Sequence, residues 1–378
     1  MARAGSASAA PHPIETRNAL LHPTVTNPTA CGCQDAAVEQ LRYLGPGDLA
    51  WQEVPAPKLD SDRAALVRPL AVATCDLDRL IIAGESPFPA PFPIGHECVA
   101  EVIDVGDDVR AVRPGQRVSV PFQISCGECA ACRRGRTGSC QSEGPMSTYG
   151  FGAAVHRWGG FLSDSVLVPF ADHMLVAVPD GLAPAAVASA SDNISDAWRS
   201  VGPALASEPH APVLVVGGAG AGSIGLYAAA IAIALGSEAV TYADLDEGRL
   251  EIARSLGAHT LEVPWPERVG PFPITVDANA TQEGITLALR STAPDGLCTS
   301  NTIYFGEQPR LPLLEMYVKI VTFKTGRVHA RPIMPEVLEL AEQGAFRPEL
   351  ITSRVVDFSD AAEALLAGDW TKLVLERS

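Results

Sequence analysis

The sequence predicts an α/β protein that combines a mostly antiparallel β domain with a doubly wound parallel sheet. Three observations predict this fold class. Short apolar runs broken by Pro and Gly fill residues 38–120, an unbroken apolar strand leads into a glycine-rich turn and an apolar helix at 213–235, and strands alternate with helical stretches after it. The 378 residues exceed the size at which single cores stop growing, roughly 250–300 residues, so two domains are expected.

The composition is that of a soluble globular protein. Charged residues make up 19% and hydrophobic residues 47%, and no apolar run reaches the ~18 residues that a membrane span needs. The net charge of −16 opposes binding to a polyanion, so nucleic acid is not an expected partner. Nine cysteines occur without a secretory signal, which favours a reducing cytoplasm over a disulfide framework.

Residues 1–35 are rich in Ala, Ser, Pro and Thr and are predicted to be a mobile N-terminal extension. A transit peptide is the alternative, because Arg3 and Arg17 accompany several serines, but the prolines weigh against it. Cys31 and Cys33 are interpreted as incidental thiols rather than as a third metal or redox element.

The stretch 94–140 carries parts of two candidate metal sites. At its far end four cysteines follow a C-x2-C-x2-C-x7-C spacing: Cys126, Cys129, Cys132 and Cys140. Four thiolates so close together suit tetrahedral zinc with no open position, so this zinc is expected to be structural. A redox dithiol, an iron–sulfur cluster and scattered core cysteines are the alternatives, although a bacterial ferredoxin run would close with x3-Cys-Pro.

His96 and Glu97 stand at the near end of the same stretch. A lone histidine beside an apolar run is more often a core residue than a metal ligand. Cys75, 21 residues earlier, and Asp192 in a later Ala-rich helical stretch can complete a Cys/His/Asp set that leaves a fourth zinc position open. Read alone, Asp192 is a helix cap; with the other two residues, the ligand interpretation is favoured.

The apolar strand 213–216, the glycine turn 217–225 and the following helix form the context in which G-x-G-x-x-G is meaningful. The helix N-terminus would supply N–H donors to phosphates. Asp244 ends the next strand and is expected to bind the adenosine ribose and repel a 2′-phosphate, favouring NAD over NADP. A glycine-rich loop without ligand is the alternative. The predicted cofactor-binding residues are Gly220, Gly222, Ser223, Ile224, Gly225 and Asp244.

Together these patterns resemble the zinc-dependent medium-chain dehydrogenase/reductase family, the alcohol dehydrogenase-like superfamily. The resemblance covers about 36–378 and rests on GHE at 95–97 with the VAEVIDVGDDVRAVRPGQRV that follows, the four-cysteine lobe, and the glycine turn with Asp244. It implies an active site in a cleft between two domains, and a homodimer or homotetramer. The implied division is a GroES-like catalytic domain at 36–190 with a zinc lobe at 123–141, a Rossmann NAD-binding domain at 191–329, and a C-terminal return to the catalytic domain at 330–378.

The resemblance also implies residue roles. Cys75, His96 and Asp192 would hold a catalytic zinc, Asp78 would support the ligating histidine, and Glu97 would lie behind the metal. With the four-cysteine site, this makes two zinc ions per chain.

Two positions depart from the family pattern. Leu77 stands where family alcohol dehydrogenases usually carry the Ser or Thr that begins a proton relay, and Asp196 replaces a Thr that commonly touches the nicotinamide. Because Leu77 cannot move a proton, zinc-bound water, Asp196 or another group does so, or the reaction does not need that relay.

The leading hypothesis is a zinc-dependent oxidoreductase that transfers hydride between NAD(H) and an alcohol or carbonyl substrate. One alternative is reduction of C=N or activated C=C bonds, motivated by Leu77, and another is a non-catalytic dinucleotide-binding protein. Phe122, Tyr149 and Trp158 suggest a hydrophobic pocket only weakly, and core packing is the better interpretation for each.

Overall fold

The computed structural model of the protein describes residues 36–152, 155–218, 220–262, 266–306 and 308–378. The predicted N-terminal extension, with Cys31 and Cys33, lies outside the described residues. None of the helices in the described part of the chain combines the length and apolar character that crossing a membrane requires.

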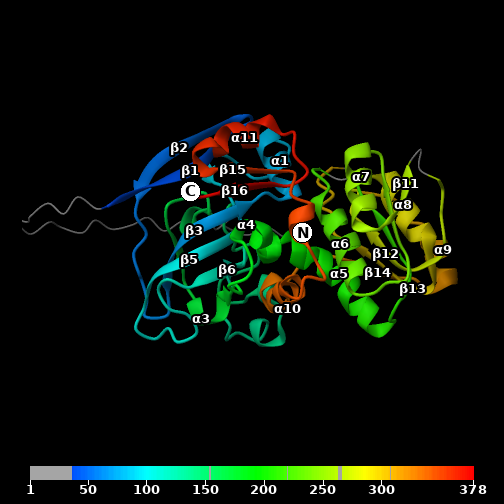
Figure 1. The fold of residues 1–378 in the computed structure, drawn as a ribbon, viewed down its shortest axis with the longest axis horizontal. Coiled ribbons are helices and arrows are strands. Elements are labelled where there is room, and N and C mark those ends of the chain that lie inside the picture. The colour runs from blue at the N-terminus through cyan, green and yellow to red at the C-terminus, as the bar shows by residue number, and fades with distance from the viewer. Residues whose placement is uncertain (1–35, 153–154, 219, 263–265, 307) are drawn as a thin grey trace, which may run out of the picture. The chain divides into compact units, whose positions relative to one another are not determined.

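Antiparallel strands dominate the first half of the described chain and the C-terminal end completes them. A hairpin of β1 (Ala37–Gly45) and β2 (Asp48–Pro55) pairs with β4 (Phe92–Pro93). A larger sheet has the order β15-β16-β3-β5-β6-β8, with β7 beside β3. Its strands are β3 (Ala65–Ala73), β5 (Glu97–Val105), β6 (Arg117–Val120), β7 (Val166–Val168), β8 (Val176–Ala177), β15 (Arg354–Asp357) and β16 (Leu373–Glu376). In Figure 1 the red β16 therefore lies next to β3.

Short helices connect these strands. The α-helices are α1 (Asp76–Ala83), α2 (Val155–Trp158), α3 (Ala171–Met174), α4 (Pro184–Val187), α10 (Ala330–Glu342) and α11 (Ala361–Ala367). The 3₁₀ turns are η1 (Cys132–Arg134), η2 (Thr137–Ser139), η3 (Ala188–Ser191), η4 (Pro348–Leu350) and η5 (Phe358–Asp360).

Six parallel strands form the second sheet, in the order β11-β10-β9-β12-β13-β14. They are β9 (Val213–Val216), β10 (Val240–Asp244), β11 (His259–Glu262), β12 (Phe272–Asp277), β13 (Thr292–Ser300) and β14 (Thr322–Thr325). The accompanying helices are α5 (Asn193–Ser207), α6 (Ser223–Ala234), α7 (Glu247–Leu256), α8 (Gln282–Ser291) and α9 (Leu313–Lys319) (Figure 1).

Helices cover both faces of this parallel sheet, which explains the unbroken apolar run of β9. Val213 and Val215 belong to the core cluster that includes residues of α5, α6 and α10, whereas Leu214 and Val216 belong to the cluster that includes residues of α8 and α9. The predicted α/β class with an antiparallel part and a doubly wound part is confirmed. The predicted domain limits stay predictions, because residues 36–378 pack as one compact unit.

The Ala-rich stretch that contains Asp192, residues 183–201, is helical as predicted. It is divided among α4, η3 and the first part of α5. The break falls at Asp192, whose backbone (φ −150°, ψ −85°) is not helical. Asp192 therefore precedes α5 without a side-chain capping hydrogen bond.

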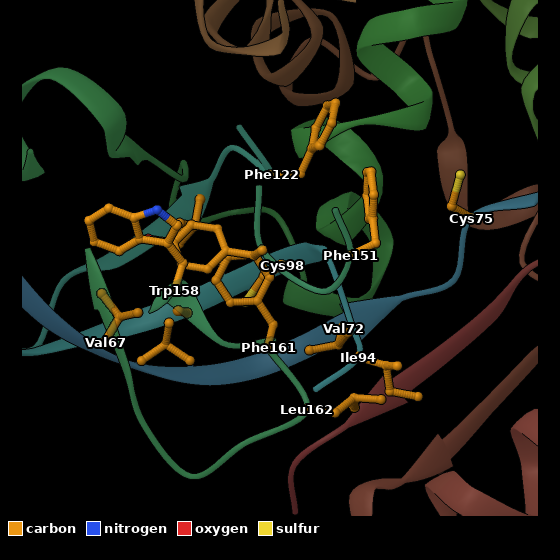
Figure 2. Packing of buried hydrophobic residues seen from close by; sticks show 14 of the residues in the cluster. Val67, Val72, Cys75, Ile94, Cys98, Phe122, Phe151, Trp158, Phe161 and Leu162 are labelled. Atoms are coloured by element: carbon orange, nitrogen blue, oxygen red, sulfur yellow. The ribbon is translucent and has the colours of Figure 1, made fainter. Parts of the chain in front are cut away.

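The core of the antiparallel half is rich in aromatic side chains. Figure 2 shows Phe122 and Phe151 next to each other, with Trp158 and Phe161 grouped further from Cys75. The Tyr149 hydroxyl donates to Leu167 O at 2.8 Å, and Trp158 Nε1 donates to Ser147 Oγ at 2.9 Å. Tyr149 and Trp158 are therefore satisfied core residues, as expected.

Candidate metal centres and cofactor cleft

The predicted catalytic-zinc ligands meet at the ends of three secondary-structure elements. Cys75 caps the start of α1, His96 follows Gly95 (φ +93°) just before β5, and Asp192 lies between η3 and α5. Ligand atoms of Cys75, His96, Asp192 and the adjacent Glu97 all lie within 4.8 Å of one another. His96 Nε2 is 3.4 Å from Asp192 Oδ2.

The donors of this cluster fit a zinc ion. His96 is 0% exposed, yet neither of its ring nitrogens has a hydrogen-bond partner among the described residues. Asp192 occupies the N-cap position of α5, but its side chain makes no capping hydrogen bond. Carboxylate oxygens lie 3.5 Å from His96 Nδ1 and 3.4 Å from Nε2 without forming a hydrogen bond to either nitrogen. A metal bound by thiolate, imidazole and carboxylate would satisfy all three groups.

Asp78 joins two of these groups. Its Oδ2 accepts the N–H of Cys75 at 2.7 Å, and its Oδ1 lies 3.5 Å from His96 Nδ1. Burial alone would lower the pKa of His96, but the carboxylates of Asp78 and Asp192 outweigh burial and raise that pKa to about 9. Asp78 is thus placed to orient the imidazole from the side opposite Asp192.

Glu97 has a partner that the sequence analysis missed. Lys372 Nζ lies 2.7 Å from Glu97 Oε2, and both side chains are 0% exposed. The same ammonium donates to Thr74 O, and Glu97 also accepts from the Ser189 hydroxyl and the Asn193 backbone N–H. A single lysine at the start of an apolar strand offers no sequence signal for this role.

The four cysteines of the second candidate site also meet. Their sulfur atoms lie within 4.8 Å of one another in a lobe that contains η1 and η2. Backbone N–H groups of Cys132 and Gln141 donate to Cys129 Sγ at 3.4 and 3.3 Å and lower its pKa to about 6. The pKa of Cys126 is also lowered, whereas burial raises the pKa values of Cys132 and Cys140. Four thiols this close together suit a closed, four-coordinate zinc site.

This zinc lobe is anchored to the segment before α10. Gln123 Nε2 donates to Val328 O at 2.8 Å, and the backbone N–H of Gly138 donates to His329 Nδ1 at 3.1 Å. These contacts join residues about 190 or more positions apart in the chain, so the lobe is part of the tertiary structure and not an isolated loop.

A cavity of about 480 Å³ lies between α1 and the carboxyl ends of the parallel strands. Cys75, Leu77 and Leu80 line one side, and Gly218, Gly220 and the segments 278–281 and 301–306 line the other. The strand order reverses between β9 and β12 at this point, which is where doubly wound sheets bind ligands. The glycine turn thus opens into the same cavity as the Cys75 thiol.

Asp244 lies at the end of β10 as expected, but both of its carboxylate oxygens already accept hydrogen bonds from other residues of the protein. Its Oδ1 accepts from Arg249 Nη2 at 2.8 Å and from two backbone N–H groups, and its Oδ2 accepts from Arg249 Nε at 2.9 Å and from the Tyr242 hydroxyl at 2.8 Å. Burial raises the pKa of Asp244, but these bonds outweigh burial and lower it. Arg249 also packs over Gly222, where a Cβ would lie 2.5 Å from Arg249 Cδ.

Leu77 and Asp196, the two departures from the family pattern, differ in position: Leu77 lines the cavity and Asp196 does not. Leu77 is buried beside Cys75 on the cavity wall. Asp196 lies one turn after Asp192 and pairs with Arg199, which also donates to Gly326 O at 2.6 Å. A part for Asp196 in proton transfer stays a prediction.

Phe122 and Phe151 flank His96, with ring centroids 6.2 and 4.9 Å from the imidazole.

Comparison with known proteins gives one matching family model and several relatives. The model describes the alcohol dehydrogenase GroES-like domain and matches residues 61–180. A glutathione-independent formaldehyde dehydrogenase of Pseudomonas aeruginosa (strain LESB58) is 32% identical over 224 residues, which are 57% of this chain and 56% of that protein. The chain thus spans little more than half the length of that relative.

Two relatives cover more of the chain. Zinc-type alcohol dehydrogenase B of Aspergillus flavus is 27% identical over 343 residues, 85% of this chain and 76% of that protein. The solved structure of the alcohol dehydrogenase TADH from Thermus sp. ATN1 superimposes with a TM-score of 0.80 at 27% identity, covering 90% of this chain and 100% of that one. The likeness therefore extends through both sheets.

Proposed function

Because this chain belongs to the zinc-dependent medium-chain dehydrogenase/reductase family, we propose that it is a zinc- and NAD-dependent oxidoreductase acting on an alcohol or carbonyl substrate. One observation carries the proposal. The buried His96, whose ring nitrogens make no hydrogen bond to the described residues, lies with Cys75 and Asp192 at the edge of the cavity into which the glycine turn opens. A metal-ligand set and a dinucleotide motif that share one cavity support hydride transfer.

Each residue has a part in this proposal. A bound zinc would supply Lewis-acid polarisation of the substrate oxygen. Cys75, His96 and Asp192 hold the ion, while Asp78 and the Glu97–Lys372 pair keep the ligand geometry. Leu77, Leu80 and Phe305 give the cavity an apolar wall, which excludes water from the reacting carbon.

The proposed cofactor is NAD(H). The Asp244 carboxylate is held ionised at the end of β10, where its charge opposes a 2′-phosphate, but Arg249 pairs with it. The preference for NAD(H) therefore requires that the ribose hydroxyls take the place of Arg249 on this carboxylate. Replacement of Asp244 by Asn would leave the Arg249 guanidinium without its carboxylate. We therefore expect this variant to shift the ratio of kcat/KM values toward NADP, which initial rates with both cofactors would measure.

The test of the proposed function is a rate assay with NAD(H) against a panel of primary alcohols, secondary alcohols and aldehydes, including formaldehyde. The zinc-loaded protein should turn over at least one of these classes, and Cys75→Ser should abolish that turnover. Cys98→Ala is the matched control, since Cys98 is a buried thiol next to Glu97 that does not belong to the ligand cluster. Turnover that survives in Cys75→Ser would refute the proposal.

Reduction of C=N or activated C=C bonds is the second candidate, favoured by the observation that Leu77 occupies the relay position beside Cys75. Iminium compounds and enals belong in the same panel. Reduction of aldehydes alone would count against this candidate.

We also propose a homo-oligomer. The short helix α9 exposes large apolar side chains: Leu313, Leu314, Tyr317 and Val318, with Ile320 directly after it. The neighbouring β14 is the edge strand of the parallel sheet and pairs on one side only within the described residues. A second copy of the chain, related by a twofold axis, would cover the apolar side chains and pair with this edge. We also propose that the protein is cytoplasmic, because its cysteines suit a reducing compartment better than a disulfide framework.

A further inference from the structure

A carboxylate of the chain itself lies where the phosphates of a dinucleotide are expected. Asp76 Oδ1 accepts a hydrogen bond from the backbone N–H of Ser223 at 3.3 Å and another from the Ser223 hydroxyl at 3.2 Å. Ser223 is the first residue of α6, a helix of twelve residues that begins directly after the glycine turn. The anion position at the N-terminus of α6 is therefore taken by Asp76.

Two further observations show that the first turn of α1 lies close to the glycine turn. A Cβ on Gly220 would lie 3.1 Å from Asp76 Cβ, and Arg79 Nη1 lies 3.5 Å from the carbonyl oxygen of Gly220. Asp76 and Gly220 both line the cavity described above. The first turn of α1 and the glycine turn thus face each other across the cofactor cleft, with the carboxylate between them.

Helix capping does not explain this arrangement. An acidic residue in the first turn of α1 stabilises that helix by its charge alone. The capping hydrogen bond of α1 is already made by Asp78, whose Oδ2 accepts the N–H of Cys75. The two hydrogen bonds of Asp76 instead run to a helix of the parallel sheet, 147 residues away in the chain.

We propose that Asp76 is an affinity-determining residue of the cofactor site: its carboxylate takes the place of a phosphate in the free protein, and a dinucleotide binds only when its pyrophosphate displaces it from Ser223. This inference rests on the proposed function, because it presupposes a dinucleotide at the glycine turn. Like charges that share one helix terminus repel, so Asp76 weakens the binding of any ligand that carries a pyrophosphate. The same repulsion speeds cofactor release.

The test compares dinucleotide affinity in the zinc-loaded full chain and in three variants. Asp76→Asn keeps an oxygen acceptor for Ser223 but removes the charge, and Asp76→Gly removes both. Glu53→Gln, on the exposed edge strand β2, removes one negative charge far from the cleft and is the control. Dissociation constants come from NADH fluorescence titration and from calorimetry with ADP-ribose, which has the pyrophosphate but no nicotinamide.

Both Asp76 variants should bind NADH and ADP-ribose more tightly than the wild type, by about tenfold or more, and Glu53→Gln should match the wild type. Unchanged affinity in both Asp76 variants of a protein that binds NADH would overturn the inference and leave the proposed function standing. A gain for NADH without a gain for ADP-ribose would also overturn it, because the pyrophosphate would then not be the competing group. Absence of binding in all four proteins would refute the proposed function, and the inference with it.

Discussion

The buried pair of Lys372 and Glu97 allows a quantitative prediction. Lys372→Met keeps the length of the side chain and removes its charge. Among the described residues, Ser189 and Asn193 then remain as the hydrogen-bond donors to the Glu97 carboxylate, which is 0% exposed. Breaking a buried ion pair by removing one partner costs about 3–5 kcal/mol, because the remaining charge is uncompensated. We expect Lys372→Met to lower the free energy of unfolding by about that amount.

The pair Arg68–Glu101 is a matched control. Its nitrogen–oxygen distance is also 2.7 Å, but its side chains are 48% and 29% exposed. Exposed pairs contribute roughly 0–1 kcal/mol, so Arg68→Met should cost no more than about 1 kcal/mol. The two variants separate the effect of burial from the effect of distance.

Urea unfolding in excess zinc, followed by circular dichroism, measures these differences. The double variant Glu97→Gln/Lys372→Met removes both charges and should recover most of the loss. A loss of stability in Lys372→Met no larger than that in Arg68→Met would refute the reasoning. So would a loss in the double variant as large as the sum of the losses measured for Glu97→Gln and Lys372→Met separately.

Three further predictions concern the metal sites and the oligomer. Elemental analysis should find two zinc ions per chain in the wild type and one in Cys75→Ser, whereas one zinc in both proteins would mean that only the four-cysteine lobe binds metal. Gly150→Ala would place a Cβ 2.5 Å from the carbonyl oxygen of Gly95, beside His96, at a φ of +70°, so we expect loss of one zinc per chain and reduced stability. Retention of full zinc content would contradict this, and Gly181→Ala, which meets nothing within 4 Å, is its control. Tyr317→Arg, at a side chain that is 83% exposed, should lower the mass measured by sedimentation if a second chain covers α9, and an unchanged mass would exclude α9 from the interface.

Much of the fold could be predicted from local sequence signals. The strand at 213–216, the glycine turn and α6 follow one another without a gap in the chain, so apolar pattern and turn chemistry were enough to place them. The four-cysteine cluster lies within 15 residues, and its spacing by itself brings the sulfur atoms together. Asp192, read alone, predicted a helix cap, and α5 begins directly after it. The missing capping hydrogen bond could not be predicted, because the Asp192 carboxylate lies with Cys75 and His96, which are distant in the chain.

The sequence by itself determined the order of the elements, the class of each sheet and the identity of the metal-site candidates, because those signals depend on residues close together in the chain. Only the tertiary structure decided which charges meet. Lys372 reaches Glu97 across 275 residues, and Asp76 reaches Ser223 across 147. Such contacts leave no periodic or spacing signal, since they arise where β16 pairs with β3 and where α1 meets the glycine turn. In the two proposals made above, these contacts determine how the metal centre is held and what a dinucleotide must displace to bind.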